Sequence, residues 1–158
     1  MTSGLSLRYM KQGEEGEVCA LAIRVFDKFV AHEFPPEGIA EFLRYAQPAA
    51  MAERSKAENT VFVAEEADHF VGMLELRGFG HIAMLFVDTP GRGVGKKLVQ
   101  QALEFCRKRA PGVDAIRVHA SRYAVPIYSK MGFEAEGSER TENGITYLPM
   151  VFRRGADG

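Results

Sequence analysis

"PGRGVGKKL", residues 90–98, decides the fold of this chain: three glycines stand at alternate positions, and two lysines and a leucine follow them at once. The residues before it, HIAMLFVD at 81–88, form a β-rich run. After it, apolar side chains recur at i, i+4 spacing from Val94 to Cys106, which is typical of an amphipathic helix. A second β-rich run, AIRVHA at 115–120, follows. Strand, glycine loop, helix and strand predict a right-handed crossover between two parallel strands.

The three glycines lie where that helix should begin, and a helix start favours an anion. The first N–H groups of a helix lack partners and the peptide dipoles leave a partial positive charge there, so phosphate is a natural ligand. Glycine lets such a ligand touch the main chain. A Walker loop does not fit, because Pro90 replaces its glycine and Lys97 its Ser or Thr, and G-x-G-x-G differs from the dinucleotide pattern G-x-G-x-x-G. A tight turn that merely tolerates glycine is the structural alternative.

Length and composition exclude several classes of protein. The 158 residues predict a single domain, 1–158, in which 153–158 form a loose tail. A net charge of −1 lacks the basic excess of nucleic-acid binding. Two distant cysteines, Cys19 and Cys106, argue against a disulfide framework and a zinc site, and the four histidines have no ligand spacing, so we expect no metal.

The sequence also gives no sign of a membrane segment. No run approaches the roughly 18 apolar residues that a membrane span needs. The first residues, MTSGLSLRYM, lack the charged start and apolar core of an export signal. We therefore expect a soluble cytoplasmic protein with no membrane partner.

Short helical and β-rich segments make up the rest of the chain. Three β-rich runs in the middle, joined by short turns, predict an antiparallel meander. Two helices are expected before these runs. The expected elements, in chain order, are a strand at 5–10, helices at 18–29 and 39–46, strands at 60–65, 69–77 and 81–88, the long helix, a strand at 115–120, a short helix at 123–131 closed by Gly132, and strands at 133–139 and 145–153 around a turn at Asn143–Gly144.

Two motifs in this order carry a resemblance: the glycine loop after a strand that ends in LFV (85–87), and AVPIYSKMGF at 124–133. The chain resembles the GCN5-related N-acetyltransferase (GNAT) family over nearly its whole length. The resemblance implies an α/β (α+β) GNAT fold with a mixed, mostly antiparallel sheet of six to seven strands, splayed between strands 4 and 5 and flanked by about four helices. The pantetheine arm of acetyl-CoA would lie in the gap and its pyrophosphate on the glycine loop.

The resemblance also implies which residues bind acetyl-CoA, the expected cosubstrate. Backbone groups of the fourth strand would meet the thioester and the pantetheine amides, although the same residues read equally well as strand core. Ser121 would reach the pantetheine arm or simply cap the short helix, and the lysines of the loop would meet phosphates or only face solvent. The implied cofactor-binding residues are Leu85, Phe86, Val87, Arg92, Gly93, Val94, Gly95, Lys96, Ser121, Tyr123 and Tyr128.

One departure from the family pattern lies inside the loop. Pro90 stands where the family usually has Arg or Gln, so a polar side chain and one N–H group are missing. Charge from Arg92, Lys96 and Lys97 would offset part of this loss. The effect on loop geometry and cofactor affinity is left open.

Acetyl transfer needs an acid for the leaving thiolate and a route by which the amine loses its proton. Tyr128 occupies the family's tyrosine position, and a phenol with a pKa near 10 can donate a proton at neutral pH. Judged by itself, a tyrosine there would be read as half-buried packing. His81 and Glu75 are the candidate bases; the alternatives are that His81 is a turn residue and that Glu75 faces solvent.

The acceptor is less defined than the cofactor. In the family, the two N-terminal helices and their connector, here 29–42, usually border the acceptor site. Glu33, Glu37 and Glu41 would attract a cationic amine or form a solvated face. The predicted function is transfer of acetyl from acetyl-CoA to a primary amine of a small molecule or protein. The alternative is a CoA-binding sensor without turnover, and a homodimer through the last strands is a further expectation.

Overall fold

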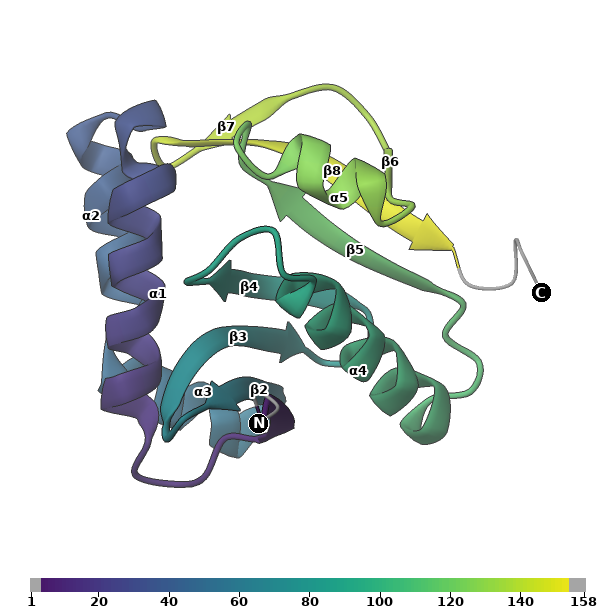
Figure 1. Cartoon of the computed structure of the whole chain (residues 1–158). Coiled ribbons are helices and arrows are strands. Elements are labelled where there is room, and N and C mark those ends of the chain that lie inside the picture. Colours follow the sequence, from purple (N-terminus) through teal and green to yellow (C-terminus); the bar gives the residue numbers. More distant parts are fainter. Residues whose placement is uncertain (1–3, 154–158) are drawn as a thin grey trace.

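The computed structural model describes residues 4–153 of the 158-residue chain. Figure 1 labels the elements along the chain. They are β1 (Ser6–Tyr9), α1 (Glu15–Phe29), the 3-10 helix η1 (Ala31–Glu33), α2 (Pro36–Tyr45), α3 (Pro48–Ala57), β2 (Asn59–Glu66), β3 (His69–Arg77), β4 (His81–Val87), α4 (Val94–Arg109), β5 (Ala115–Ala120), α5 (Val125–Lys130), β6 (Glu134–Ala135), β7 (Arg140–Glu142) and β8 (Ile145–Arg153).

One mixed sheet organises the chain in the order β1-β2-β3-β4-β5-β8-β6, with β7 also paired to β8. Every neighbouring pair is antiparallel except β4 and β5, which α4 connects as a parallel crossover. The predicted mixed, mostly antiparallel GNAT sheet is therefore confirmed. It has eight strands because the C-terminal segment contributes two very short ones, β6 and β7, beside β8.

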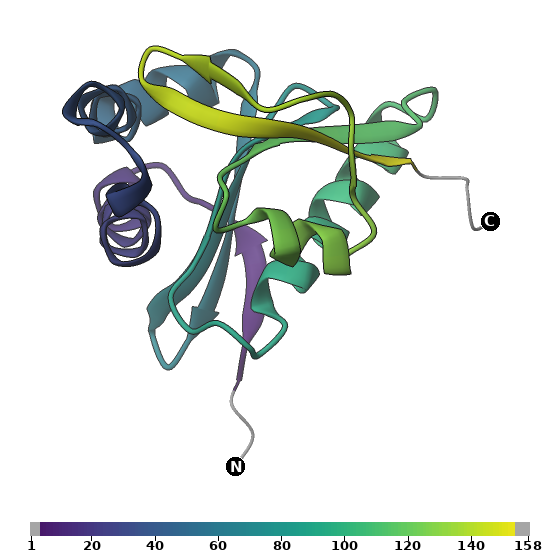
Figure 2. The same ribbon diagram turned by 90° about the horizontal axis from the view of Figure 1, so that it is seen from above.

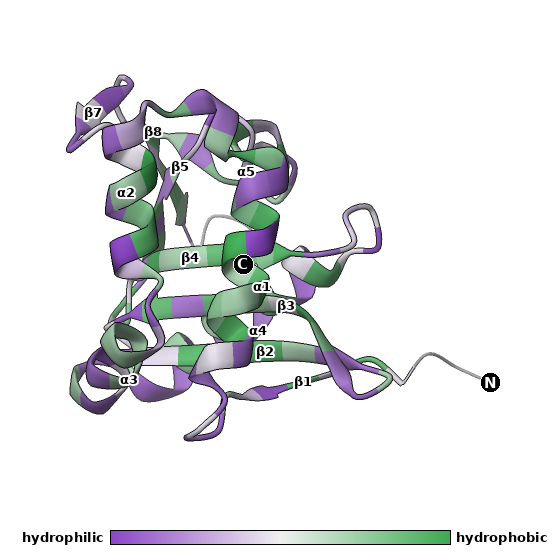
Figure 3. Cartoon of the chain, turned by 90° about the vertical axis from the view of Figure 1, so that its left-hand side faces the viewer, coloured by the Kyte–Doolittle hydropathy of each residue, from purple (hydrophilic) through white to green (hydrophobic). Residues whose placement is uncertain are grey.

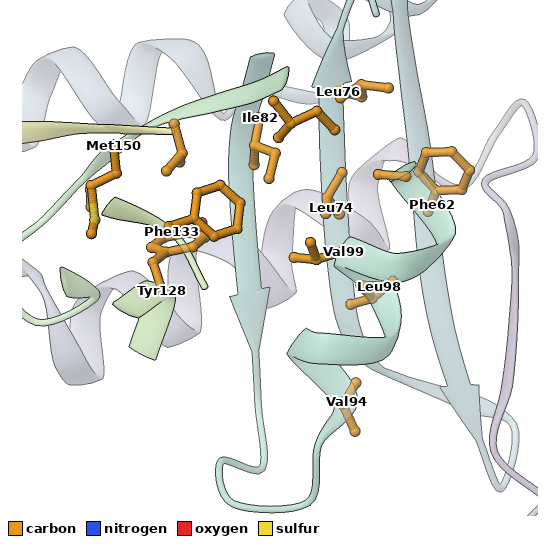
Figure 4. Close-up of a cluster of buried hydrophobic side chains, with 14 of the residues drawn as sticks. Phe62, Leu74, Leu76, Ile82, Val94, Leu98, Val99, Tyr128, Phe133 and Met150 are labelled. Atoms are coloured by element: carbon orange, nitrogen blue, oxygen red, sulfur yellow. The ribbon is translucent and has the colours of Figure 1, made fainter. Parts of the chain in front are cut away.

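Helices cover both faces of this sheet, and each face has its own hydrophobic core. Figure 2 shows α1 and α2 on one side and α4 and α5 on the other. Adjacent residues of a strand serve the two cores in turn: in β2, Val61 packs with α1 and α3, while Phe62 packs with α4. Figure 4 shows the second of these cores, in which Val94 and Leu98 of α4 lie to one flank of the strand that carries Ile82 and Tyr128 lies to its other flank.

β4 and β5 part soon after they begin. Only His81 with Arg117 and Ile82 with Val118 are in register, and the Arg117 N–H donates to the Gly80 carbonyl at 2.8 Å. Beyond these pairs the two strands diverge toward their C-terminal ends (Figure 1). The predicted splay between strands 4 and 5 therefore lies directly before the glycine loop.

Three expectations need correction or completion. A third helix, α3, precedes the central strands, where only two were expected. Arg153 is the last residue of β8, whereas 154–158 of the predicted tail lie outside the described residues. β8 pairs with β5 along one edge and with β6 and β7 along the other, so in this structure its edge is not open to a second copy over those positions.

Within residues 4–153, no helix combines the length and the apolar character that crossing a bilayer requires. Cys19 and Cys106 are both buried, and within the described residues neither is part of a disulfide. The cytoplasmic location remains a prediction.

Two glycines let α2 rest on the turn between β7 and β8. Figure 3 shows the polar β7 beside α2. A Cβ at Gly38 would lie 2.2 Å from the Gly144 carbonyl oxygen, and Gly144 itself has φ +81°. Because the obstacle is backbone, no rotamer change can relieve it.

Gly38→Ala should therefore destabilise the fold by about 2–3 kcal/mol, the range of a severe overpacking clash. Gly16→Ala is the matched control, since it is also a helical glycine but a Cβ there meets nothing within 4 Å. It should stabilise by about 0.4–1 kcal/mol through the unfolded chain. Urea unfolding measures both, and equal effects of the two substitutions would contradict the close contact.

Candidate functional site

The glycine loop makes a left-handed turn into α4. Gly91 has φ +89° and Gly93, the residue that precedes the helix, has φ +77°. These conformations disfavour residues with a Cβ. At both positions a Cβ would meet no atom within 4 Å. Glycine is thus required by the turn, and no side chain of residues 4–153 fills the space beside it.

Free donors lie at the same place. The Lys97 N–H donates to the Gly93 carbonyl at 3.1 Å, so the N–H groups of Val94, Gly95 and Lys96 precede the first intrahelical bond of α4. No side chain caps this helix start. Main-chain donors, the positive end of the helix dipole and open space together suit an anionic group such as a diphosphate.

Of the charged residues in the loop, Arg92 forms an ion pair and the two lysines are exposed. The Arg92 guanidinium donates to both carboxylate oxygens of Glu66, at the end of β2, at 2.8 and 2.6 Å. Lys96 and Lys97 are exposed. Arg92 therefore ties the loop to the sheet, while the lysines extend from the helix start.

Where β4 and β5 have separated, the backbone edge of β4 that faces β5 has no strand partner. Within the described residues, no β5 residue is paired with Leu85, Phe86 or Val87. All three are only partly buried, and their side chains pack against the cores of both faces. The segment Leu85–Val87 therefore contributes side chains to the cores and also leaves its backbone edge toward β5 unpaired.

Tyr128 lies on α5 beside this gap. Its side chain is 4% exposed and its ring meets that of Phe133 at 5.1 Å between centroids (Figure 4). Burial raises the pKa of the Tyr128 phenol above its usual value, so the group stays protonated. Within residues 4–153, we find no hydrogen bond made by its hydroxyl. Tyr128 is thus packed more completely than the half-buried alternative supposed, and among the described residues its hydroxyl is a protonated donor without a fixed partner.

The turn between β5 and α5 carries two more of the predicted residues. The Ser121 hydroxyl accepts the Ala124 N–H at 3.3 Å, which is a bond within the turn before α5; among the described residues, no side chain caps α5 itself. Tyr123 stacks on Phe29 of α1 and lines a surface pocket of about 400 Å³ with Pro126, Ile127 and Lys130.

His81 starts β4 and belongs to a small ring cluster. It meets His119 of β5 edge to face at 4.8 Å, and His119 stacks on Tyr147 of β8 at 4.0 Å. Burial, together with the nearby charges of Arg77, His119 and Arg117, lowers the pKa of His81 to about 4. His81 is therefore neutral at pH 7, as a proton acceptor must be. Tyr147 was not singled out from the sequence.

The neutral His81 also predicts how stability depends on pH. An unfolded histidine has a pKa near 6.5, so the unfolded chain binds more protons than the folded one between about pH 6.5 and pH 4. Stability should be fully present above pH 6.5 and fall toward pH 4. His81→Gln should flatten this part of a melting-temperature profile, whereas substitution of the exposed His32 by Gln should not. A profile unchanged by His81→Gln would contradict the assignment.

Glu75 has a different environment from the one expected. Its side chain is fully buried, so the expectation that it faces solvent is wrong. Arg54 donates to its two oxygens at 2.8 and 3.0 Å, and the Asn59 amide donates at 2.6 Å. Both oxygens already accept charged or polar donors, which suits a structural carboxylate. Its role as a base remains a prediction without support from this geometry.

The structure thus brings the loop, the β4 edge and Tyr128 to the open side of the β4–β5 splay. His81 lies at the other end of β4, where the two strands still pair. Glu75 points into the core formed with α1 and α3. Among residues 4–153, no cluster of three or more His, Cys, Asp or Glu could hold a metal ion.

A family model described as an acetyltransferase (GNAT) domain matches residues 30–154, which is most of the chain. A peptidyl-lysine N-acetyltransferase, YjaB of Salmonella typhimurium, is 35% identical over 80 residues. That alignment covers 49% of this chain and 52% of the relative, so the chain spans about half the length of the curated relative it matches.

Solved structures share the fold over nearly the whole chain. A GCN5-related N-acetyltransferase from Rhodopseudomonas palustris has a TM-score of 0.80 at 24% identity and covers 97% of this chain and 98% of its own. The PaiA N-acetyltransferase of Thermoplasma acidophilum, solved with coenzyme A, has a TM-score of 0.79 at 17% identity and covers 97% and 99%. With its glycine loop, its splayed sheet and the family match, the chain belongs to the GNAT family of acetyltransferases.

Proposed function

We propose that this protein transfers an acetyl group from acetyl-CoA to a primary amine, with Tyr128 as the proton donor. The observation that carries the proposal is the open left-handed turn at Gly91 and Gly93, which leads into the free N–H groups of α4. These donors would hold the diphosphate of coenzyme A. The unpaired edge of β4, at Leu85–Val87, would hold the pantetheine arm by main-chain hydrogen bonds.

The reaction requires two proton movements. The amine nitrogen bonds to the carbonyl carbon of the thioester, the carbon–sulfur bond breaks, and the sulfur leaves as a thiolate that must gain a proton. The buried, protonated Tyr128 is suited to give that proton. The amine must lose a proton, and His81 is the proposed acceptor through water: it is neutral at pH 7, although its lowered pKa makes it a weak base and it lies at the other end of β4.

The acceptor is a primary amine of a small molecule or of a protein. A protein lysine is supported by the name of the Salmonella relative, which acts on peptidyl-lysine. That support is limited to a match over about half of each chain. The splay and the connector between α1 and α2 are the places where selectivity would reside.

A thermal shift with acetyl-CoA, followed by detection of released thiol with pooled amines and a lysine-containing peptide, tests the function. At 100 times its Kd, acetyl-CoA should add about 2.7 kcal/mol to the free energy of unfolding. Absence of both stabilisation and heat on titration would refute the proposal. Binding without thiol release across the panel would favour a CoA sensor.

Gly93→Ala tests the turn itself. An alanine held at φ +77° is strained by about 1–2 kcal/mol, so the variant should lose its turn and bind CoA at least tenfold more weakly. Gly112→Ala is the control, because a Cβ there also meets nothing within 4 Å but its φ is not left-handed. Isothermal titration of both variants gives the Kd values. Equal Kd values for the two would show that the turn does not hold the cofactor.

A further inference from the structure

Glu33, the last residue of η1, reaches across the molecule to the turn that leads into α5. Its two carboxylate oxygens accept the backbone N–H groups of Arg122 and Tyr123 at 3.1 and 2.8 Å. The residues joined are 89 and 90 positions apart in sequence. The Arg122 guanidinium is not involved, since it binds Glu139 at 2.8 Å. The contact therefore depends on the backbone of the turn and on the single carboxylate.

A second contact of a different kind reinforces the first. The rings of Phe29, at the end of α1, and Tyr123 are stacked with centroids 5.1 Å apart and planes 14° apart. Phe29 and Glu33 lie on the two sides of the short segment that joins α1 to η1. The connector on the acceptor side is thus fixed to the turn 121–124 by one charge-assisted and one aromatic contact.

Nothing in the sheet fixes this turn relative to β4. β5 pairs with β4 only through its middle residues Arg117 and Val118, and its last residue, Ala120, is paired with Leu148 of β8 alone. The width of the splay at the end of β5 therefore depends on contacts outside the sheet. Glu33 supplies such a contact directly at the turn.

The turn 121–124 also fixes the position of Tyr128 through backbone hydrogen bonds. The Ser121 carbonyl accepts the Ala124 and Val125 N–H groups at 2.9 and 3.0 Å, and the Ala124 carbonyl accepts the Tyr128 N–H at 2.9 Å. A continuous run of hydrogen bonds leads from the Glu33 carboxylate to the residue proposed as acid. A shift of the turn would move the Tyr128 hydroxyl with it.

We infer that Glu33 is a positioning residue: it fixes the turn 121–124 against the acceptor-side connector and so sets the Tyr128 hydroxyl relative to β4. This inference rests on the proposed function. It also explains how the connector that borders the acceptor can be coupled to the proton donor without touching it. An acid misplaced by about 1 Å can reduce a rate by up to 10²-fold.

Glu33→Ala and Glu33→Gln, compared with Asp27→Ala, test the inference. Asp27 is an exposed carboxylate near the end of α1 and serves as control. We expect Glu33→Ala to lower kcat at least tenfold while the Kd for CoA changes by a smaller factor, because the carboxylate of Glu33 bonds to the turn 121–124 and not to the glycine loop. Glu33→Gln keeps one carbonyl acceptor and should fall between Glu33→Ala and the parent. Asp27→Ala should match the parent.

Hydrogen exchange gives a readout that does not depend on turnover. The Arg122 and Tyr123 amides should be protected in the parent and exchange faster in Glu33→Ala. An unchanged kcat in Glu33→Ala overturns the positioning role, and so does a loss confined to the acceptor KM, which would mean that Glu33 binds the amine. Protected amides in a parent that releases no thiol would instead refute the proposed function and leave the contact itself intact.

Discussion

Replacing Tyr128 with phenylalanine should lower kcat by about 10²–10⁴-fold and leave the Kd for CoA within about twofold. The substitution removes one oxygen from a ring that is 4% exposed and keeps the packing against Phe133. Because the described residues offer this hydroxyl no hydrogen-bond partner, folding stability should be retained. A loss of kcat at constant Kd and constant melting temperature would therefore report on the proton alone.

The pH profile sharpens this experiment. Burial raises the pKa of Tyr128, so its ionisation should not limit the parent's activity at any pH up to about 10, the ordinary tyrosine value. Tyr147→Phe is the matched control: Tyr147 is equally buried but stacks on His119, away from α5. A Tyr128→Phe variant that kept kcat within threefold of the parent would remove Tyr128 from the mechanism.

Sequence patterns that span only a few residues predicted the turns and the helix start of the site. The loop 90–98 predicted the start of α4, since a helix start depends on neighbours within a few residues. Gly132 at the end of α5, with φ +104°, and the Asn143–Gly144 turn were predicted for the same reason. The parallel crossover followed from the order of strand, loop, helix and strand.

The missed helix α3 shows where local patterning becomes ambiguous. Its sequence, PAAMAERSKA, buries only Met51, so it lacks the apolar stripe that predicts a helix. The sequence predicts a helix that ends at 46, and Pro48, two residues later, is the first residue of α3, a position where proline is well tolerated. A proline at this position signals a boundary but does not say on which side the helix lies.

Contacts between distant segments could not be predicted at all. Glu33 was weighed as an amine-binding or solvated carboxylate, and it instead holds two amides about 90 residues away. His119 and Tyr147 join His81 only because β5 pairs with both β4 and β8. One feature was suggestive: His119 and Tyr147 interrupt apolar strands, and polar aromatic residues in such positions tend to have partners.

Arg54→Met should destabilise the fold by about 3–5 kcal/mol, the largest effect on stability that we expect from a single substitution here. The substitution keeps an apolar stem and removes the guanidinium that donates to both oxygens of Glu75 at 2.8 and 3.0 Å. Glu75 is 0% exposed, so its charge would be left in the core with only the Asn59 amide. The same change also removes the guanidinium from the face of the Tyr45 ring, 3.6 Å from its centroid.

Two further variants distinguish the effect of an unpaired buried charge from the general effect of removing an arginine. Arg44→Met, on α2, removes a guanidinium whose partner is Glu41 on the exposed surface, and it should change stability by less than about 0.5 kcal/mol. The double variant Arg54→Met, Glu75→Met removes both charges and should recover much of the loss, because an apolar pair in place of a buried ion pair is often neutral. Urea unfolding of the three variants gives the comparison. If the double variant were no more stable than Arg54→Met alone, the loss would come from packing around Tyr45 and not from the stranded carboxylate. Recovery would instead assign this ion pair to the fold and leave His81 as the remaining one of the two bases predicted from the sequence.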